Sequence, residues 1–381
     1  MQQTYTAESV ARGHPDKLCD QIADAILDDC LTHDPQARVA CEVLATQGHI
    51  VVAGEITCTR PPNVEAIARA VLNEIGYDGN SFQITSLLHP QSEDIAQGVA
   101  HSLESRRGQL STGMGAGDQG IVVGYACDET WQYLPLPVVL AHRLTQQLDA
   151  ARWELPFLGP DGKAQVTVEY DDLGRPSRIH TVVLSAQHSQ DVPQDELFFE
   201  LTDKVVTPAL SILPPDENTK LLLNPAGRFV VGGPDADTGL TGRKLAADTY
   251  GVFAAHGGGS FSGKDPTKVD RSGAYMARYI AKNLVAARLC NRCQVTLAYA
   301  IGREQPVAVE VDTFGTGKYC ADDCLAGVVQ LLFGLTPGEI IQELDLLTPR
   351  YLRTAAYGHF GRRDFPWERT DKVKELRDAL L

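Results

Sequence analysis

The stretch from residue 37 to residue 57 reads ARVACEVLATQGHIVVAGEIT, and it decides the fold class. Apolar and polar residues alternate on both sides of Gln47-Gly48, which predicts a hairpin of two strands, Ala37–Leu44 and Ile50–Thr57. Alternation gives a sheet one apolar face, which a helix can cover. The hairpin therefore predicts a layer of sheet with helices packed on it.

The segments around this hairpin supply the rest of one structural unit. They predict a loop, a helix with apolar residues four positions apart, a second helix that stops at glycine, and a closing strand. These are Ser9–Asp16; Leu18, Ile22 and Ile26; Val64–Ile75 before Gly76; and Phe82–Leu88.

The same order of elements occurs twice more along the chain. The second copy comprises a strand, a helix, a hairpin, a helix and a strand: Ile121–Tyr125; Leu140, Leu144 and Leu148; Gln165–Tyr170 with Ile179–Leu184; Leu197–Leu210; and Lys220–Leu223. The third comprises a strand, a helix, a hairpin and a helix: Leu245–Tyr250; Met276, Ile280, Leu284 and Ala287; Gln294–Ala300 with Val307–Thr313; and Ala321–Phe333. Three copies indicate triplication of a β-α-β-β-α-β unit.

The chain length agrees with a division into domains. A chain of 381 residues exceeds what one core usually serves, so two or three domains are expected. The repeats favour three, with predicted ranges 1–110, 111–230 and 231–381. The fold class we predict is α+β, with three similar α/β domains and mixed sheets covered by helices.

Composition excludes several classes of protein. Hydrophobic residues make up 43% and charged residues 22%, which is typical of a globular chain. The 34 basic residues are outnumbered by 49 acidic ones, for a net charge of −15, which argues against a nucleic-acid or anionic-membrane binding surface. An anionic substrate remains possible because a substrate experiences local charge.

Neither the N-terminus nor the cysteine content indicates an exported protein. The N-terminus lacks an apolar signal core, and the longest apolar runs, Leu134–Leu140 and Val328–Leu335, fall short of the ~20 residues that span a bilayer. Nine cysteines, an odd number, are typical of reduced thiols. A soluble, cytoplasmic protein is expected.

The first loop with chemical potential is Gly13-His14-Pro15-Asp16-Lys17, at the entrance to a helix. Helix N-termini attract anions because their backbone N–H groups are unpaired and the dipole is positive there. His14 can contact a phosphate or transfer a proton, and Asp16 can bind Mg²⁺. The alternative is that Asp16 only caps the helix after Pro15.

The second is the glycine-rich loop from Gly257 to Asp265. Gly258, Gly263 and Lys264 match G-x-x-x-x-G-K, but Asp265 stands where a P-loop needs Ser or Thr for Mg²⁺. A loop of this kind can still hold phosphates through backbone N–H groups and Lys264, and the alternative is a flexible linker.

The segment Arg228–Arg278 has seven basic and five acidic residues, a net charge of +2 in an acidic chain. Together with the loop chemistry this charge suggests a polyphosphate site, and the alternative is ordinary solvated surface.

Two weaker patterns complete the inventory. Gly115-Ala116-Gly117-Asp118-Gln119-Gly120 precedes a strand, and Asp118 can hold an ammonium or hydroxyl group, or the segment is simply a tight turn. Two cysteine pairs have the spacing of zinc half-sites or, alternatively, are packed thiols: Cys290 with Cys293, and Cys320 with Cys324.

Together these loops and further motifs, in this order along the chain, resemble the bacterial S-adenosylmethionine synthase (methionine adenosyltransferase) family. The matching motifs are GHPDK at 13–17, ACE at 40–42, GEIT at 54–57, GAGDQG at 115–120, NPAGRFVVGGP at 224–234, GLTGRK at 239–244, GGGSFSGKDPTKVDRS at 257–272 and TAAYGHFGR at 354–362. The resemblance implies three intertwined domains. It also implies that methionine sulfur attacks C5′ of ATP, and that the displaced tripolyphosphate is hydrolysed to pyrophosphate and phosphate.

The resemblance also assigns roles to residues. His14 lies near the leaving oxygen, and the polyphosphate is bound by Lys163, Arg243, Lys244 and Lys264. Further ATP contacts are Asp161, Arg228, Phe229, Asp237 and Ser260. The methionine contacts are Glu55, Gln91, Asp118, Asp237 and Lys268.

The implied cofactors are two Mg²⁺ per site, held by Asp16 and Asp270, and one K⁺ per subunit, associated with Glu42. The implied assembly is a homotetramer, a dimer of dimers with sites between two subunits.

The sequence departs from the family in three places. The usual KQSPDI reads PQSEDI at 90–95, which retains Gln91. The loop Gly98–Gly113, a gate over the site in the family, is atypical and is followed by Met114 instead of glutamine, and Ser260 replaces an alanine. Gating is therefore the inference that transfers least well.

Two other functions remain open on sequence alone. An ATP-dependent phosphotransferase using the loop at 257–265 would release ADP. A non-catalytic nucleotide-binding protein on the same fold usually loses metal or phosphate ligands, whereas His14, Asp16, Lys264 and Asp270 are all present.

Overall fold

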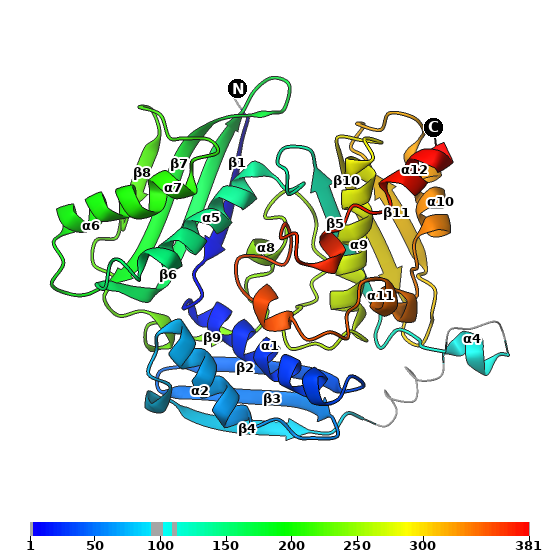
Figure 1. Cartoon of the computed structure of the whole chain (residues 1–381), viewed down its shortest axis with the longest axis horizontal. Coiled ribbons are helices and arrows are strands. Elements are labelled where there is room, and N and C mark those ends of the chain that lie inside the picture. Colours follow the sequence, from blue (N-terminus) through cyan, green and yellow to red (C-terminus); the bar gives the residue numbers. More distant parts are fainter. Residues whose placement is uncertain (1–2, 93–101, 109–112, 381) are drawn as a thin grey trace.

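Three β-sheets, each with helices packed on it, surround the middle of the molecule (Figure 1). The computed structural model describes residues 3–92, 102–108 and 113–380. The sheets contain both parallel and antiparallel pairs, which confirms the predicted α+β class with mixed sheets.

The first sheet has the strand order β4-β3-β2-β9 and contains the hairpin from which the prediction began. Its strands are β2 (Arg38–Thr46), β3 (His49–Thr57), β4 (Gln83–His89) and β9 (Gly239–Leu240). The helices α1 (Pro15–His33) and α2 (Val64–Ile75) accompany it. As predicted, α2 ends at Gly76, which adopts the left-handed conformation with φ +112°.

The second sheet has the order β1-β6-β7-β8. Its strands are β1 (Gln3–Val10), β6 (Leu158–Tyr170), β7 (Pro176–His188) and β8 (Lys220–Leu223). It is accompanied by α5 (Leu136–Ala151), α6 (Gln194–Leu201), a π-helical turn (Thr202–Val206) and α7 (Thr207–Ala209).

The third sheet has the order β11-β10-β5. Its strands are β5 (Gly120–Cys127), β10 (Arg292–Tyr299) and β11 (Ala308–Asp312). The helices on this side are α9 (Val269–Ala286), α10 (Asp322–Leu332), α11 (Pro337–Glu343) and α12 (Val373–Leu380). Short helices α4 (Leu103–Arg106) and α8 (Leu245–Asp248) lie in connecting segments.

Each repeat contributes its first strand to another repeat's sheet. β1 pairs with β6, β5 pairs with β10, and β9 pairs with β2, so the exchange closes in a ring. The three repeats are therefore interlocked. Whether the ranges 1–110, 111–230 and 231–381 are separate domains stays a prediction of the sequence.

Two hydrophobic cores hold these layers together. One joins the first and third sheets through the buried faces of α1, α2 and α9, and the other lies between α5, α6 and the second sheet. Figure 1 shows α1, α5 and α9 on the sides of their sheets that face the middle of the molecule. The ends of these helices are therefore well placed to carry a site.

The structure corrects two predicted elements. The segment Leu245–Tyr250, predicted as a strand, begins with the helical turn α8, because Leu245, Ala246 and Ala247 favour helix and the N–H of Asp248 reaches the carbonyl of Lys244 at 2.8 Å. The predicted loop Ser9–Asp16 is shorter than expected, because Ser9 and Val10 end β1.

Within the described ranges, no single helix is long and apolar enough to cross a membrane, and α10 with α11 passes that test only as a pair bent by 76°.

Candidate functional site

A cavity of about 390 Å³ lies where the end of β3, the segment after β4 and the start of α9 meet. Six of the residues singled out from the sequence line it: Glu55, Gln91, Asp118, Lys264, Lys268 and Asp270. Arg38 and His89 also line it and were not predicted, and the His89 ring lies 3.3 Å from the Glu55 carboxylate. The cavity therefore presents both positively and negatively charged side chains, which suit the two charged groups of a zwitterionic ligand.

The glycine-rich loop is held against β2 before it enters α9. The Cys41 N–H donates to the Gly263 carbonyl at 2.9 Å, and Lys264 forms an isolated bridge with Ala40. Gly263 has φ +80°, and a Cβ there would lie 1.9 Å from the Cys41 carbonyl oxygen. The loop is thus a fixed part of the first sheet's surface, which excludes the flexible-linker interpretation.

Asp265 explains why the loop departs from a P-loop. Its buried carboxylate accepts the N–H of Val39 at 2.7 Å and the N–H of Thr267 at 3.0 Å, and pairs with Lys268. Asp265 therefore stabilises the loop against β2, whereas the corresponding Ser or Thr of a P-loop faces Mg²⁺.

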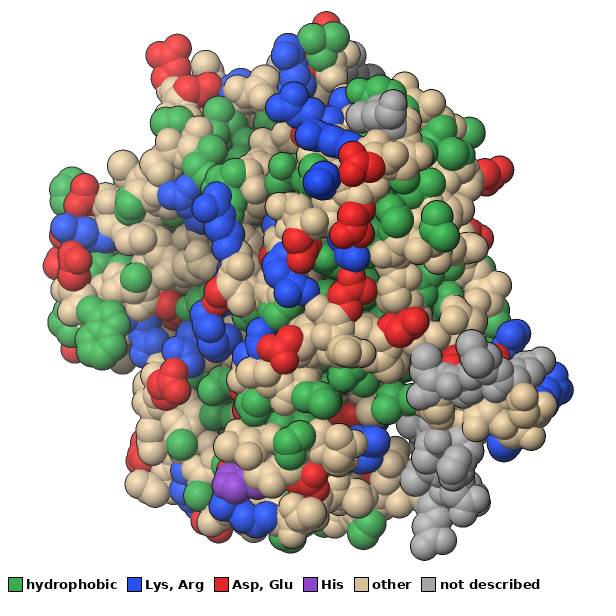
Figure 2. All heavy atoms as spheres, turned by 45° about the vertical axis from the view of Figure 1, so that its right-hand side comes forward, with side chains coloured by type: hydrophobic (Ala, Val, Ile, Leu, Met, Phe, Trp, Pro, Cys, Tyr) green, Lys and Arg blue, Asp and Glu red, His purple; other side chains and the backbone are tan. Residues whose placement is uncertain are grey.

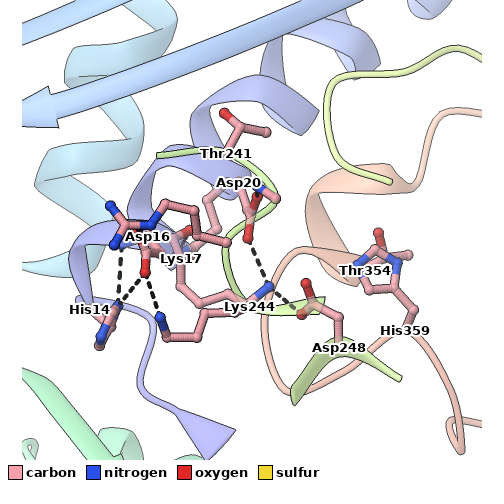
Figure 3. Close-up of polar contacts among 12 residues, drawn as sticks. His14, Asp16, Lys17, Asp20, Thr241, Lys244, Asp248, Thr354 and His359 are labelled. Carbon is pink, nitrogen blue, oxygen red and sulfur yellow. Dashed lines mark hydrogen bonds and ion pairs between the residues drawn. The ribbon is translucent and has the colours of Figure 1, made fainter. Parts of the chain in front are cut away.

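A second group of predicted residues surrounds His14 at the start of α1. His14 is the N-cap residue, and its Nδ1 accepts the Asp16 N–H at 3.2 Å, so His14 and not Asp16 caps the helix. The Asp16 carboxylate is 3% exposed and accepts the Leu240 N–H at 2.9 Å and the Lys244 ammonium at 2.5 Å. The two loops GHPDK and GLTGRK thereby meet at one carboxylate (Figure 3).

Electrostatics set the charge of this His14 group. Burial lowers the pKa of His14 to about 4, and the nearby positive charge of Lys244 is the second largest cause. The ring is therefore neutral at pH 7. Burial alone raises the pKa of Asp16, but hydrogen bonds from Lys244 and Leu240 outweigh it and leave the pKa below its usual value. Because His14 Nδ1 accepts a hydrogen bond, its proton lies on Nε2, which is free to donate.

Two more bases extend the group. Arg243 approaches the Asp16 carboxylate at 3.7 Å, and Lys163 on β6 pairs with Glu8 on β1 at 2.8 Å. The strand exchange brings Lys163 near the His14 loop, because β1 leads directly into that loop and pairs with β6.

The remaining predicted ATP contacts lie on β6, in the segment after β8 and in the glycine-rich loop. The buried Asp161 carboxylate accepts the Gly233 N–H at 2.7 Å, and burial, with Asp237 adding, raises its pKa to about 6. The Phe229 backbone pairs with His188, and Arg228 donates to Gln190. Ser260 packs against Gly242, where a Cβ would lie 2.4 Å from the Ser260 Cβ.

We call the cavity one half-site, and the His14 group together with the Asp161–Asp237 group the other half-site. Of the described residues that line the 390 Å³ cavity, none belongs to the His14 group or to the Asp161–Asp237 group. Figure 2 shows that basic and acidic side chains are interleaved over the middle of one face, without a field of one sign.

Sequence reasoning missed the residues that support both half-sites. These are Asp20 and Asp24 on α1, together with Lys17, Asp248 and Arg271. The signal was present in the sequence, since Asp16, Asp20, Asp24 and Asp28 recur every four residues within the helix.

Several predicted features lie partly or wholly outside the described residues. Of PQSEDI, residues 93–95 lie outside, while the Gln91 N–H donates to Thr57 at 3.0 Å. Of the loop Gly98–Gly113, residues 98–101 and 109–112 lie outside. Met114, next to that loop, packs against the larger core.

The chemistry of the donors fits magnesium at the two predicted ligands. Asp16 and Asp270 are carboxylates paired with lysines, Lys244 and Lys264, the latter at 2.7 Å. A Cβ at Gly259 would lie 2.3 Å from the Asp270 carboxyl carbon, so only glycine leaves this carboxylate accessible. Among the described residues, no group of three or more His, Cys, Asp and Glu is arranged to hold a metal.

The cysteines do not form a shared cluster. Cys290 and Cys293 are buried beside each other, whereas Cys320 is half-buried and Cys324 is exposed, and all four thiols are free. Glu42, the predicted potassium-associated residue, is exposed on β2.

Comparison with known proteins shows the family of the chain. Residues 2–93, 113–229 and 231–369 match the N-terminal, central and C-terminal domains of S-adenosylmethionine synthetase. An S-adenosylmethionine synthase of Desulforudis audaxviator (strain MP104C) is 53% identical over 388 residues, and one of Nocardioides sp. (strain ATCC BAA-499 / JS614) is 53% identical over 389 residues. Each match covers 98% of this chain and 98% of the relative. The chain belongs to the S-adenosylmethionine synthetase family.

Proposed function

We propose that the two half-sites bind ATP and L-methionine and convert them to S-adenosylmethionine. In this reaction the methionine sulfur attacks C5′ of ATP, the C5′–O bond breaks, and tripolyphosphate leaves before it is hydrolysed to pyrophosphate and phosphate. The observation that carries the proposal is the cavity lined by Glu55, Asp118, Lys264, Lys268 and Asp270. It combines groups for an amino acid with groups for a polyphosphate.

The bases account for departure of a highly charged leaving group. Lys163, Arg243, Lys244 and Lys264 supply positive charge where negative charge develops, and fixed charge of this kind is usually the largest contribution to catalysis. His14, neutral with its proton on Nε2, donates a hydrogen bond to the leaving oxygen without adding a buried charge.

Methionine binds through complementary charges in the cavity. Glu55 and Asp118 accept the ammonium group, and Lys268 attracts the carboxylate. Gln91 and Asp237 complete the contacts. Fixing the amino acid at both charged groups orients the sulfur for in-line attack.

The adenosine end of ATP contacts the segment after β8. Phe229 offers an aromatic face to the purine, and Arg228, Asp161 and Ser260 are the further ATP contacts of this proposal.

Asp16 and Asp270 hold magnesium, and Glu42 is associated with potassium. Bound Mg²⁺ neutralises phosphate charge and favours departure of the polyphosphate. Lys244 and Lys264 pair with those carboxylates and would contact phosphate oxygens if Mg²⁺ occupied Asp16 and Asp270.

Two subunits complete each site, in a homotetramer built as a dimer of dimers. The separation of the His14 group from the cavity supports this arrangement, because one chain then supplies one half of each of two sites. Analytical ultracentrifugation measures the oligomeric state, and a monomer that forms product would contradict it.

The test of function is to incubate the protein with ATP, Mg²⁺, K⁺ and methionine. We expect S-adenosylmethionine, phosphate and pyrophosphate, all dependent on methionine. Lys264→Ala should slow turnover by about 10²-fold or more, because it removes a charge-assisted phosphate contact. The control is Lys220→Ala, an exposed lysine on β8 that lies outside both half-sites.

ADP as the product would instead identify a phosphotransferase. Near-normal turnover of Lys264→Ala would contradict the role given to that lysine.

A further inference from the structure

One face of α1 carries four aspartates at intervals of four residues: Asp16, Asp20, Asp24 and Asp28. This interval places side chains above one another along a helix. Asp20 is 1% exposed and Asp24 is not exposed at all. A buried carboxylate is costly unless it is paired and hydrogen-bonded, so the partners of these two residues define what they stabilise.

Asp20 fixes the backbone directly before two predicted polyphosphate-binding bases. Its Oδ1 accepts the Gly242 N–H at 2.9 Å, and Gly242 is followed by Arg243 and Lys244. Its Oδ2 accepts the ammonium of Lys17 at 2.8 Å, which also pairs with Asp248 (Figure 3).

Asp24 fixes both ends of the loop that carries Lys264. Its Oδ1 accepts the Gly263 N–H at 2.9 Å, one residue before Lys264. Both of its oxygens accept from Arg271, at 2.7 and 2.8 Å, one residue after Asp270. Arg271 also donates to the Lys264 carbonyl at 3.2 Å, which closes the loop upon itself.

Asp28 makes the same type of contact with a segment that has no predicted site residue. Its two oxygens accept the N–H groups of Tyr351 and Leu352 at 2.8 and 2.9 Å. Asp28 therefore serves as a control for Asp20 and Asp24, because it anchors a backbone segment that carries no predicted phosphate-binding residue.

We propose that Asp20 and Asp24 are positioning residues that set where the polyphosphate-binding bases stand. Asp20 acts through Gly242 on Arg243 and Lys244, and Asp24 acts through Gly263 and Arg271 on Lys264. The proposal rests on the function proposed above. The position of each backbone limits where the charged end of its long side chain can reach, and a small displacement of a charged group in a site lowers the rate strongly.

The experiment compares Asp20→Ala, Asp24→Ala and Asp28→Ala in the full chain. Calorimetry measures binding of tripolyphosphate in the presence of Mg²⁺, steady-state kinetics give kcat and KM for ATP, and thermal unfolding gives Tm. We expect the first two variants to bind tripolyphosphate about tenfold more weakly and to have a kcat lower by about tenfold or more. Asp28→Ala should lower Tm but keep the binding and kinetic constants within about twofold of the wild type.

One further variant strengthens the comparison. Asp24→Asn retains an acceptor for Gly263 and should restore part of the tripolyphosphate affinity that Asp24→Ala loses. If Asp24→Ala does not fold because the buried Arg271 loses its carboxylate partner, the comparison of Asp20→Ala with Asp28→Ala decides the question.

The proposal is overturned if Asp20→Ala and Asp24→Ala bind tripolyphosphate as the wild type does, or if Asp28→Ala loses as much affinity as they do. A wild-type protein that binds tripolyphosphate with Mg²⁺ but forms no S-adenosylmethionine would contradict the proposed function while leaving this comparison intact.

Discussion

At the scale of single residues, each predicted magnesium ligand is paired with a predicted phosphate-binding lysine. Asp16 pairs with Lys244, and Asp270 pairs with Lys264. Such pairs keep buried or half-buried charges compensated while no polyphosphate is bound. Under the proposed function, a polyphosphate with Mg²⁺ would give new partners to both members of each pair.

Asp16→Asn should raise the Mg²⁺ concentration needed for half-maximal S-adenosylmethionine formation by about tenfold, since an amide is a weaker ligand for a hard cation than a carboxylate. A Mg²⁺ titration at fixed ATP and methionine measures this. Asp29→Asn, on the same helix but in contact with His33 and Arg60, is the control. An unchanged titration curve for Asp16→Asn would refute the ligand assignment.

At the scale of elements, the glycine-rich loop behaves as an extra segment of the first sheet. Gly263, Lys264 and Asp265 all contact β2, through the Cys41 N–H, a bridge to Ala40 and the Val39 N–H. Phosphate-binding loops hold anions through preset backbone N–H groups. Pairing with β2 supplies that rigidity here.

Two glycines in this loop allow a matched test. Gly263 and Gly258 both have positive φ, +80° and +98°, but only at Gly263 would a Cβ meet backbone, while at Gly258 nothing lies within 4 Å. Gly258→Ala should lower the free energy of unfolding by about 1 kcal/mol, the cost of the conformation alone. Gly263→Ala should cost about 3 kcal/mol or more, because β2 or the loop must move.

Urea unfolding measures both variants, and activity assays show whether displacement of the loop also reduces turnover. Equal destabilisation by the two substitutions would show that the contact with Cys41 does not constrain the loop.

At the scale of the whole molecule, the repeats are interlocked by exchange of their first strands. β1, β5 and β9 each close the sheet of another repeat, and without them β6, β10 and β2 would expose edges. The exchange also distributes the site. β1 leads into the His14 loop beside Lys163 of β6, and β9 precedes Arg243 and Lys244.

A subunit-mixing experiment tests how the half-sites combine. Lys244→Ala and Lys264→Ala, each inactive alone, are co-expressed with different tags, and heterodimers are purified through both. If each site takes one half from each subunit, one of the two sites in a heterodimer is intact, and about half of the wild-type activity per dimer should return. Continued inactivity would place both halves of a site in one subunit.

Local features of the fold were predictable from the sequence because their causes are local. Alternation and Gln47-Gly48 predict the first hairpin, Gly76 marks the end of α2, and the apolar run Lys220–Leu223 coincides with β8. Glycine-rich loops before helices likewise indicate where phosphate chemistry lies. The roles of particular side chains came from the resemblance of whole motifs to a family and stay proposals.

The sequence by itself determined the repeated unit, the α+β class and the loops that carry charged side chains, since helix and strand periods, caps and turns act over a few residues. Only the packing of the whole chain fixed the pairing of β1 with β6, with Gln3 opposite Tyr170. It also decided that Asp20 and Asp24 face the loops before Lys244 and Lys264. The physical reason is that these partners lie more than a hundred residues apart along the chain, and burial and hydrogen bonding select among them only once the layers pack.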